Sequence, residues 1–175
     1  MSCIAIITAR GGSKRIPKKN IKEFCGKPII AYSIEAALNS GIFDEVMVST
    51  DSEEIAEIAV QYGAKVPFMR SENNSNDFAT TNDVLCEVVN DYKEKQDKVF
   101  DFVCCLYPTA PFVTATKLKE TFDILKASKA DQVVPVVKFS FPPQRCFVID
   151  EAGNMKYKWP ENQSKRSQDL EPYYH

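Results

Sequence analysis

Short apolar segments alternate with longer amphipathic segments along most of this chain. Residues 3–8, 46–50 and 102–106 are almost continuously apolar, as expected of strands buried on both faces of a parallel sheet. Two further strands are predicted at 65–69 and 132–137. Apolar residues recur with helical spacing over the ranges 28–41, 51–63, 81–95 and 115–128. The alternation predicts a three-layer α/β fold with a doubly wound, mostly parallel sheet.

Local signals mark where some of these helices begin and end. Pro28 suits a first helical turn, and Gly41 suits the end of the same helix. Asp51 stands before a predicted helix with Glu54 three residues later, which is the signature of an N-cap. Because capping accounts for Asp51, we prefer that role to metal binding, although Asp51 follows a strand at the sheet edge where ligands bind.

The pattern changes after Lys138. Two short apolar segments, 146–149 and 155–159, flank the turn-like stretch 150–154, which predicts a β-hairpin. A lone two-stranded ribbon cannot bury side chains this large. We therefore expect a hairpin arm within residues 140–168 that packs on another surface, with an edge hairpin folded back on its own domain as the alternative.

Composition indicates one compact domain that spans residues 1–175. The 175 residues are 44% hydrophobic and 26% charged, which suffices for a single core. The net charge of −2 argues against a nucleic-acid partner. No apolar segment approaches the roughly 20 residues of a membrane span, so we expect no membrane partner and a cytoplasmic location. The six cysteines are expected to be buried reduced thiols, with zinc ligation a remote alternative.

A glycine-broken basic loop follows the first predicted strand. It contains no acid and carries Arg10, Lys14, Arg15, Lys18, Lys19 and Lys22. Gly11-Gly12-Ser13 lets backbone N–H groups approach an anion, so the loop reads as a polyphosphate cradle. The alternative is a solvated basic loop. Neither the P-loop motif nor the dinucleotide-binding glycine motif is present.

The loop sequence ARGGSKRIPKKN at 9–20, followed by GKPIIAYSI at 26–34, resembles the CMP-sialic acid synthetase (acylneuraminate cytidylyltransferase) family. The resemblance continues through 48–52, Arg70, 79–81, 108–111 and 166–170, and so covers essentially the whole chain. It implies a Rossmann-like nucleotidyltransferase that transfers CMP from CTP to the anomeric hydroxyl of an acidic nine-carbon sugar and releases pyrophosphate. It also implies a homodimer in which the hairpin arm crosses the interface.

The resemblance assigns roles residue by residue. Nucleotide-binding positions are Ala9, Arg10, Gly11, Gly12, Ser13, Lys14, Asn20, Arg70 and Thr81. Arg10, Ser13 and Lys14 would hold the triphosphate and Lys19 would stabilise the reacting phosphate, so the catalytic set is Lys19, Arg10 and Lys14. Asn20, Arg70 and Thr81 would contact the cytidine. Their alternatives are a turn residue, a surface cation and a helix cap.

The chain departs from the sialic acid synthetases before the Pro-Thr-Ala-Pro motif. Tyr107 stands where those enzymes carry glutamine. An aromatic ring in place of an amide suits a less hydroxylated sugar, and this resembles the pseudaminic acid branch; the alternative is that Tyr107 packs away from the ligand. Arg166, Gln168 and Asp169 complete the implied sugar site, with the Arg166 guanidinium suited to the sugar carboxylate.

Family members are longer and bind Mg²⁺ through an Asp-x-Asp pair near the carboxyl terminus. Residues 1–175 contain no such pair. We therefore expect Mg²⁺ as cofactor, no metal ligands within this chain, and ligands in a C-terminal part that the chain lacks. Two alternatives stay open. One is a nucleotidylyltransferase for another sugar or sugar phosphate, disfavoured because Arg10 precedes the glycine pair; the other is a non-catalytic nucleotide-binding module.

Overall fold

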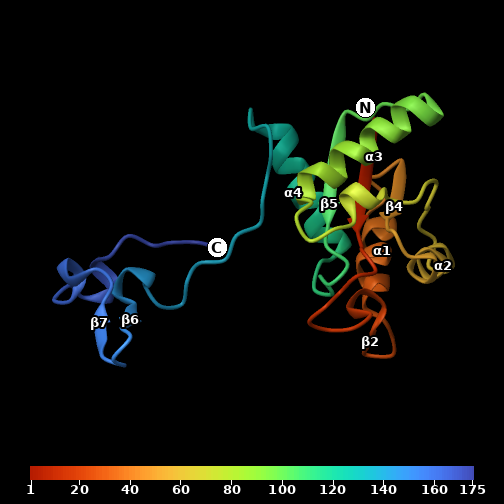
Figure 1. The fold of residues 1–175 in the computed structure, drawn as a ribbon. Coiled ribbons are helices and arrows are strands. Elements are labelled where there is room, and N and C mark those ends of the chain that lie inside the picture. The colour runs from red at the N-terminus through yellow and green to blue at the C-terminus, as the bar shows by residue number, and fades with distance from the viewer. The chain divides into compact units, whose positions relative to one another are not determined.

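The computed structural model describes residues 1–175, which form two compact units, Met1–Lys129 and Ala130–His175 (Figure 1). The expectation of one domain over 1–175 stays a prediction.

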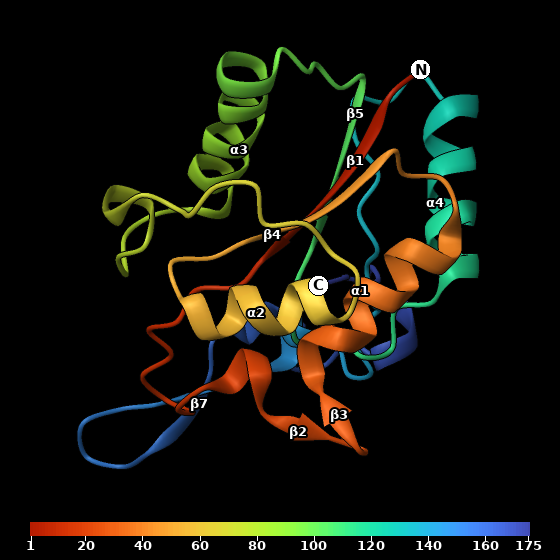
Figure 2. The same ribbon diagram turned by 90° about the vertical axis from the view of Figure 1, so that its right-hand side faces the viewer.

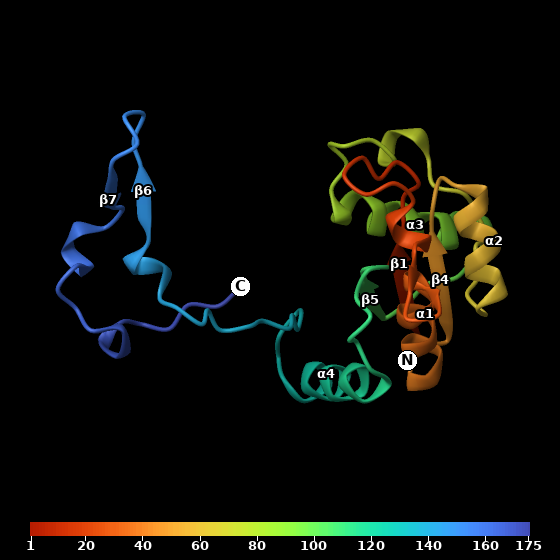
Figure 3. The same cartoon turned by 90° about the horizontal axis from the view of Figure 1, so that it is seen from below.

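The first unit is built on a three-stranded parallel sheet. Its strands are β1 (Cys3–Thr8), β4 (Glu45–Ser49) and β5 (Phe102–Leu106), in the order β4-β1-β5 (Figure 3). Ile6 in the central strand lies opposite Met47 and Cys105. Residues 3–7 of β1 are buried, which explains the absence of polar alternation in this segment.

Four helices connect and cover the strands. They are α1 (Ile29–Ser40), α2 (Glu53–Gln61), α3 (Thr81–Gln96) and α4 (Ala115–Ala127). Each lies within a residue or two of its predicted range. Gly41 ends α1 in the left-handed conformation at φ 64°, which glycine adopts without steric cost. The short strands β2 (Glu23–Phe24) and β3 (Lys27–Pro28) pair with each other before α1.

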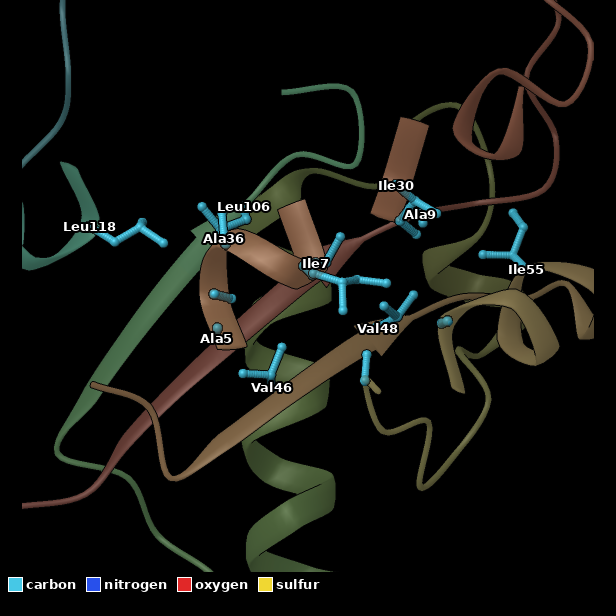
Figure 4. Packing of buried hydrophobic residues seen from close by; sticks show 14 residues of the cluster. Ala5, Ile7, Ala9, Ile30, Ala36, Val46, Val48, Ile55, Leu106 and Leu118 are labelled. Carbon is cyan, nitrogen blue, oxygen red and sulfur yellow. The ribbon is translucent and has the colours of Figure 1, made fainter. Parts of the chain in front are cut away.

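Alternate residues of β1 pack on opposite helical layers. Ala5 and Ile7 belong to a core with Ile30 and Ile34 of α1, and Figure 4 shows them beside Val46 and Val48 of β4. Ile4 and Ile6 point the other way, into a second core with Val88 and Tyr92 of α3. Helices α1 and α3 therefore lie on opposite sides of the sheet (Figure 2), which confirms the three-layer arrangement.

Two predicted strands do not form, and each is interrupted by a proline. Lys65 makes a single bridge with Met47, but Pro67 has no N–H with which to continue the ladder. The range 132–137 contains Pro135 and forms no strand. Backbone pairing there begins only at its last residue, Val137, which exchanges two hydrogen bonds with His175 at 2.9 Å beside the bridge between Lys138 and Tyr174.

The second unit contains the predicted hairpin. It comprises β6 (Phe147–Ile149) and β7 (Met155–Tyr157), flanked by the 3₁₀ turns Pro143–Arg145, Pro160–Asn162 and Ser167–Asp169. Asp150 Oδ1 closes the connecting turn by accepting hydrogen bonds from the Ala152 and Asn154 N–H groups at 3.1 and 2.9 Å. The hairpin prediction is confirmed.

All six cysteines are free, but their burial differs from the prediction. Cys3 is buried, whereas Cys25 and Cys86 are exposed, so the expectation of buried thiols is wrong for these two. Cys25 follows Phe24 at the tip of the β2–β3 hairpin, where little packs against it. None of the helices combines the length and the apolar character needed to cross a membrane.

Candidate active site

A cavity of about 240 Å³ opens at the carboxyl ends of β1 and β5. This is the sheet edge at which open α/β proteins bind ligands. The cavity is lined by residues from the basic loop, the segment before α3, the start of α3 and the end of β5: Thr8, Arg10, Lys19, Asn20, Arg70, Asn74, Asn76, Asp77, Ala79, Thr80, Thr81, Val84, Tyr107, Pro108 and Thr109.

Six of the residues predicted from the sequence line this one cavity: Arg10, Lys19, Asn20, Arg70, Thr81 and Tyr107. Ala9 lies beneath it, fully buried, with its N–H bonded to the Ser49 carbonyl at 2.9 Å. Gly11, Gly12, Ser13 and Lys14 continue the loop beside the cavity without lining it. Residues from segments as far apart as 10 and 107 therefore converge as the resemblance implies, while their roles stay predictions.

The basic loop is held at its start by Asp51. The Gly11 N–H donates to Asp51 Oδ1 at 2.7 Å. The N-cap of α2 is instead Ser52, whose Oγ accepts from the Ile55 N–H at 3.5 Å. The prediction that Asp51 caps this helix is therefore wrong by one residue. The Asp51 carboxylate holds the basic loop, and the Ser52 hydroxyl caps α2.

Asn20 holds the far end of the same loop. Its side chain is buried, and its Nδ2 donates to the Arg10 carbonyl at 2.9 Å. This bond connects the two ends of the predicted cradle, so Asn20 is more than a turn residue. Lys19 precedes it in the 3₁₀ turn Lys19–Ile21. Lys18 enters that turn with a left-handed backbone, φ 52°.

The Lys19 ammonium differs from the other two cations that line the cavity. Arg10 and Arg70 are both engaged by protein acceptors. Lys19 lines the cavity, and no hydrogen bond or ion pair of the structure involves its ammonium group. Among these three cations it is the one whose charge is not already matched by the protein.

Arg70 is an anchored, half-buried group, which rules out the surface-cation alternative. Its Nε donates to Ser49 Oγ at 2.9 Å, and its Nη2 donates to the Ser49 carbonyl at 2.5 Å. Burial lowers the pKa of Arg70, and the carboxylates of Asp51 and Glu87 act in the opposite direction. Two fixed bonds leave the guanidinium little freedom to reorient.

Asp77 is a site residue that sequence reasoning missed. Its Oδ1 lies 2.9 Å from Arg10 Nη1, and its Oδ2 forms an ion pair with the Lys14 ammonium. Lys14 and then Arg10 hold the pKa of this carboxyl below its usual range. An acid in a polar stretch carries no signal that it meets cations more than 60 residues earlier in the chain.

Tyr107 faces the cavity from the end of β5. Its hydroxyl lies 3.4 Å from Thr81 Oγ1, and its carbonyl accepts a hydrogen bond from Ser33 Oγ at 2.8 Å. Thr80, not Thr81, caps α3, because Thr80 and Asp83 form a reciprocal capping box. The cap alternative for Thr81 is therefore wrong. The Thr81 side chain is available at the cavity wall.

The other predicted sugar-site residues belong to the second unit. Arg166 forms a two-pronged pair with Asp169, with Nε–Oδ2 at 2.7 Å and Nη2–Oδ1 at 3.1 Å. Both side chains are exposed, as is Gln168 between them. Pairs of this kind are worth about 1 kcal/mol or less, so a ligand carboxylate can replace Asp169 on Arg166.

No group of three or more His, Cys, Asp or Glu side chains is arranged to hold a metal ion. Three acids contact the loop, and each is engaged by the loop's own donors: Asp51 by the Gly11 N–H, Asp77 by Arg10 and Lys14, and Glu54 by Lys18. The residues present therefore do not make a metal site on their own.

Known proteins resemble this chain over its full length. A pseudaminic acid cytidylyltransferase of Campylobacter jejuni subsp. jejuni serotype O:2 is 47% identical over 176 aligned positions, which cover 100% of this chain and 75% of the relative. A CMP-N,N'-diacetyllegionaminic acid synthase of Legionella pneumophila is 44% identical over 157 positions, 89% of this chain and 66% of the relative.

Solved structures confirm the fold. A CMP:2-keto-3-deoxy-manno-octonic acid synthetase complexed with CTP superposes with a TM-score of 0.67 at 22% identity, covering 99% of this chain and 70% of that one. A 4-diphosphocytidyl-2C-methyl-D-erythritol synthase from Anaerococcus prevotii gives 0.62 at 16% identity, covering 99% and 68%. The cytidylyltransferase family profile matches residues 4–150. The chain therefore belongs to the cytidylyltransferase family.

Proposed function

We propose that the chain transfers CMP from CTP to the anomeric hydroxyl of an acidic nine-carbon sugar of the pseudaminic or sialic acid type. Family membership and the names of the relatives support this reaction. The observation that carries it is the convergence of Arg10, Lys19 and Arg70 with Asn20 and Thr81 on one cavity at the ligand-binding edge of a parallel sheet.

The cation-rich side of the cavity suits the triphosphate. Arg10 and Lys14 lie close enough to share one carboxylate, so they can also share one polyphosphate chain. Backbone N–H groups at Gly11–Ser13 provide further donors beside them. Asn20, Arg70 and Thr81 then lie at the cavity for contacts with the base and ribose.

The reaction makes one bond and breaks one. The anomeric oxygen of the sugar attacks the α-phosphorus, and the bond from that phosphorus to the bridging oxygen of pyrophosphate breaks. Negative charge grows on the transferring phosphoryl oxygens and on the departing pyrophosphate. The Lys19 ammonium lines the cavity and is not matched by a protein acceptor, so it is the group best placed to stabilise this charge. The proton of the sugar hydroxyl goes to a base that we do not assign.

Residues of each unit, taken separately, are our candidates for contacts with the sugar. Tyr107 gives the cavity a flat apolar wall, which suits a sugar with few hydroxyls. Arg166 is our candidate for the sugar carboxylate, with Gln168 and Asp169 beside it. The planar guanidinium of Arg166 donates two parallel hydrogen bonds to the Asp169 carboxylate. A sugar carboxylate can accept the same two bonds in place of Asp169.

Mg²⁺ is the expected cofactor, but the residues described here do not form a site for it. We propose that its ligands correspond to the part of the longer relatives that this chain does not match. When bound, the ion would offset phosphate charge.

We also propose a homodimer held by the hairpin arm, and a cytoplasmic location. The support for a dimer is the apolar face of the hairpin. Phe147 pairs with Tyr157 and Ile149 with Met155, so all four lie on one face, and Ile149 and Met155 are 74% and 65% exposed. An exposed face of this kind marks an interaction site.

Pyrophosphate release tests the proposal. The assay contains CTP, Mg²⁺ and one acidic sugar at a time: pseudaminic, legionaminic or N-acetylneuraminic acid, with a neutral sugar phosphate as comparison. Lys19→Ala should lower the rate by about 10²–10³, as the loss of one transition-state donor does. Lys22→Ala is the matched control, because Lys22 belongs to the same loop but lies outside the cavity. Equal loss in both variants, or activity with the sugar phosphate alone, would contradict the proposal.

A further inference from the structure

Three contacts place Asp77 against the phosphate-binding cations. Its carboxylate bridges Arg10 and Lys14, and the same Arg10 Nη1 donates to the Asn76 carbonyl at 2.9 Å. Arg10 and Lys14 are the cations that the proposed function assigns to the triphosphate. A carboxylate oxygen therefore lies where a phosphate oxygen must lie.

The segment that carries Asp77 is tied down at both ends. At its start, Glu87 accepts hydrogen bonds from the Ser71 N–H at 2.7 Å, from Ser71 Oγ at 2.9 Å and from Asn74 Nδ2. At its end, the capping box of Thr80 and Asp83 starts α3. Between these anchors, the Asn76 side chain accepts hydrogen bonds from the Phe78 and Ala79 N–H groups at 2.8 and 3.0 Å. Asp77 therefore lies in a short segment that is anchored by hydrogen bonds on both sides.

This span also forms part of the cavity wall. Asn74, Asn76, Asp77 and Ala79 line the cavity together with Arg10. The segment has no other tie to the basic loop than the contacts of Asn76 and Asp77 with Arg10 and Lys14. Releasing those contacts would free one wall of the nucleotide site while its two ends stay anchored.

We propose that Asp77 is an internal substitute for the nucleotide's phosphates, a latch that holds the segment 75–79 on the cation cradle until a triphosphate displaces it. The inference rests on the proposed function, since it requires Arg10 and Lys14 to be the triphosphate receptors. A triphosphate bound to Arg10 and Lys14 would lie next to the Asp77 carboxylate, and the two negative charges would repel each other. The two groups therefore cannot share the same two cations. The triphosphate carries more charge and more oxygen atoms than the Asp77 carboxylate, so it displaces the carboxylate from Arg10 and Lys14.

The charges around Asp77 support this assignment. Both of its partners are cations, and they hold the pKa of its carboxyl below the usual range, so it is ionised at neutral pH. The Lys14 side chain is 80% exposed and Asp77 is 42% exposed, so these pairs are weak enough to be broken by a ligand. The latch lowers nucleotide affinity without blocking the site.

Binding of three probes to Asp77→Asn tests the latch. The probes are CTP, inorganic tripolyphosphate and cytidine, measured by calorimetry at one ionic strength. Asp77→Asn keeps the size of the side chain and removes its charge. CTP and tripolyphosphate should bind about 3- to 10-fold more tightly than to the unchanged chain, as expected from the loss of two weak competing ion pairs. Cytidine affinity should not change.

Glu72→Gln is the matched control. Glu72 is an exposed acid in the 3₁₀ turn Glu72–Asn74, just before the segment 75–79, and no ion pair of the structure involves it, so this variant makes the same change in net charge without touching Arg10 or Lys14. It should bind all three probes as the unchanged chain does. An equal gain in both variants would overturn the latch and indicate general charge repulsion. The melting temperature of every variant shows whether it is folded. If Asp77→Asn does not fold, Asp77→Ser also removes the charge and takes its place.

Failure of the latch can be told from failure of the proposed function. If the unchanged chain binds CTP and tripolyphosphate but Asp77→Asn binds them equally or more weakly, the latch is wrong and the nucleotide site stands. Weaker binding would mean that Asp77 aligns the two cations. If the unchanged chain binds neither triphosphate, the proposed function and the latch are both wrong.

Discussion

The Gly11 N–H donates to the Asp51 carboxylate at 2.7 Å, and this bond joins the basic loop after β1 to the turn after β4. The two strands are neighbours in the parallel sheet, so their carboxyl ends bring the two turns together. The approach is close enough that a side chain at position 11 would collide. A Cβ on Gly11 would lie 3.0 Å from Ser52 Cβ, whereas a Cβ on Gly12 would have nothing within 4 Å.

Alanine at these two glycines should therefore have different effects. Gly11→Ala requires Ser52 to shift by a few tenths of an ångström, and we expect it to lower the free energy of unfolding by about 1 kcal/mol and to weaken CTP binding. Gly12→Ala should stay within about 0.5 kcal/mol, because the space is open. Urea denaturation and CTP binding measure both effects. Equal effects at positions 11 and 12 would show that the loop does not pack on Ser52.

The contact also shows where sequence reasoning fails. Asp51 and Ser52 are adjacent residues that can both cap a helix, and the pattern of Asp51 with Glu54 favours the first. In the structure the Asp51 carboxylate accepts a hydrogen bond from the Gly11 N–H, 40 residues earlier, and Ser52 caps the helix. A local sequence pattern contains no information about so distant a partner.

Elements with a strong local pattern were predictable. The uninterrupted apolar run of β1 and the helical spacing of α1 to α4 depend on residues close in sequence, and both predictions are confirmed. The strands at 65–69 and 132–137 fail because Pro67 and Pro135 remove ladder donors, a signal present in the sequence but outweighed by apolar composition.

The candidate site was predictable only in part. The resemblance identified the residues that line the cavity from the basic loop and from β5. It did not identify Asp77 or Ser49, the partners of Arg10 and Arg70. Those pairs join segments that are distant in sequence, and their side-chain types are ordinary in loops and strands.

The nucleotide site should prefer CTP to UTP and ATP. Asn20 and Arg70 are held by bonds to the Arg10 carbonyl and to Ser49, so two of the polar groups that we propose to contact the cytidine are fixed in position. A wrong base would leave some of them without partners, at a cost of about 1–3 kcal/mol each. Competition binding with the three nucleotides measures the preference. ATP that competes as well as CTP would remove the cytidine assignment of Asn20, Arg70 and Thr81.

The hairpin arm should hold a dimer through its apolar face. Ile149→Asp places a charge on the face that also carries Met155, and we expect this variant to sediment as a monomer or to aggregate. Lys156→Asp is the control on the opposite face of β7. An unchanged chain that sediments as a monomer at high concentration would contradict the proposed dimer.

Glu45 should contribute to stability in a pH-dependent way. This carboxylate at the start of β4 is only 5% exposed and pairs with Lys65 at 2.9 Å and Lys98 at 3.3 Å. Burial opposes its ionisation, but hydrogen bonds from Lys65 and Lys98 outweigh burial and lower its pKa below the usual value. The stabilisation is therefore complete above the unfolded-state pKa, about 4.3, and is lost as the pH falls through the folded-state value.

Glu45→Gln tests this dependence. At pH 7 the free energy of unfolding of the variant should be about 1–2 kcal/mol lower than that of the unchanged chain. The difference is modest because both lysines are largely exposed. The difference from the unchanged chain should shrink as the pH is lowered below about 4. Glu57→Gln, an exposed acid of α2, is the control and should show no such trend. A constant difference across the pH range would mean that Glu45 acts through packing alone.

In the proposed reaction, the sugar's own oxygen attacks the α-phosphorus of CTP. The most direct measurement uses pseudaminic acid labelled with ¹⁸O at the anomeric hydroxyl, incubated with the chain, CTP and Mg²⁺ and followed by ³¹P NMR. We expect a phosphodiester signal of a CMP-sugar, shifted by ¹⁸O in the bridge between sugar and phosphorus, with unlabelled pyrophosphate formed in equal amount. A CMP-sugar without the label in that bridge, or CTP left unchanged with every acidic nine-carbon sugar tried, would contradict it.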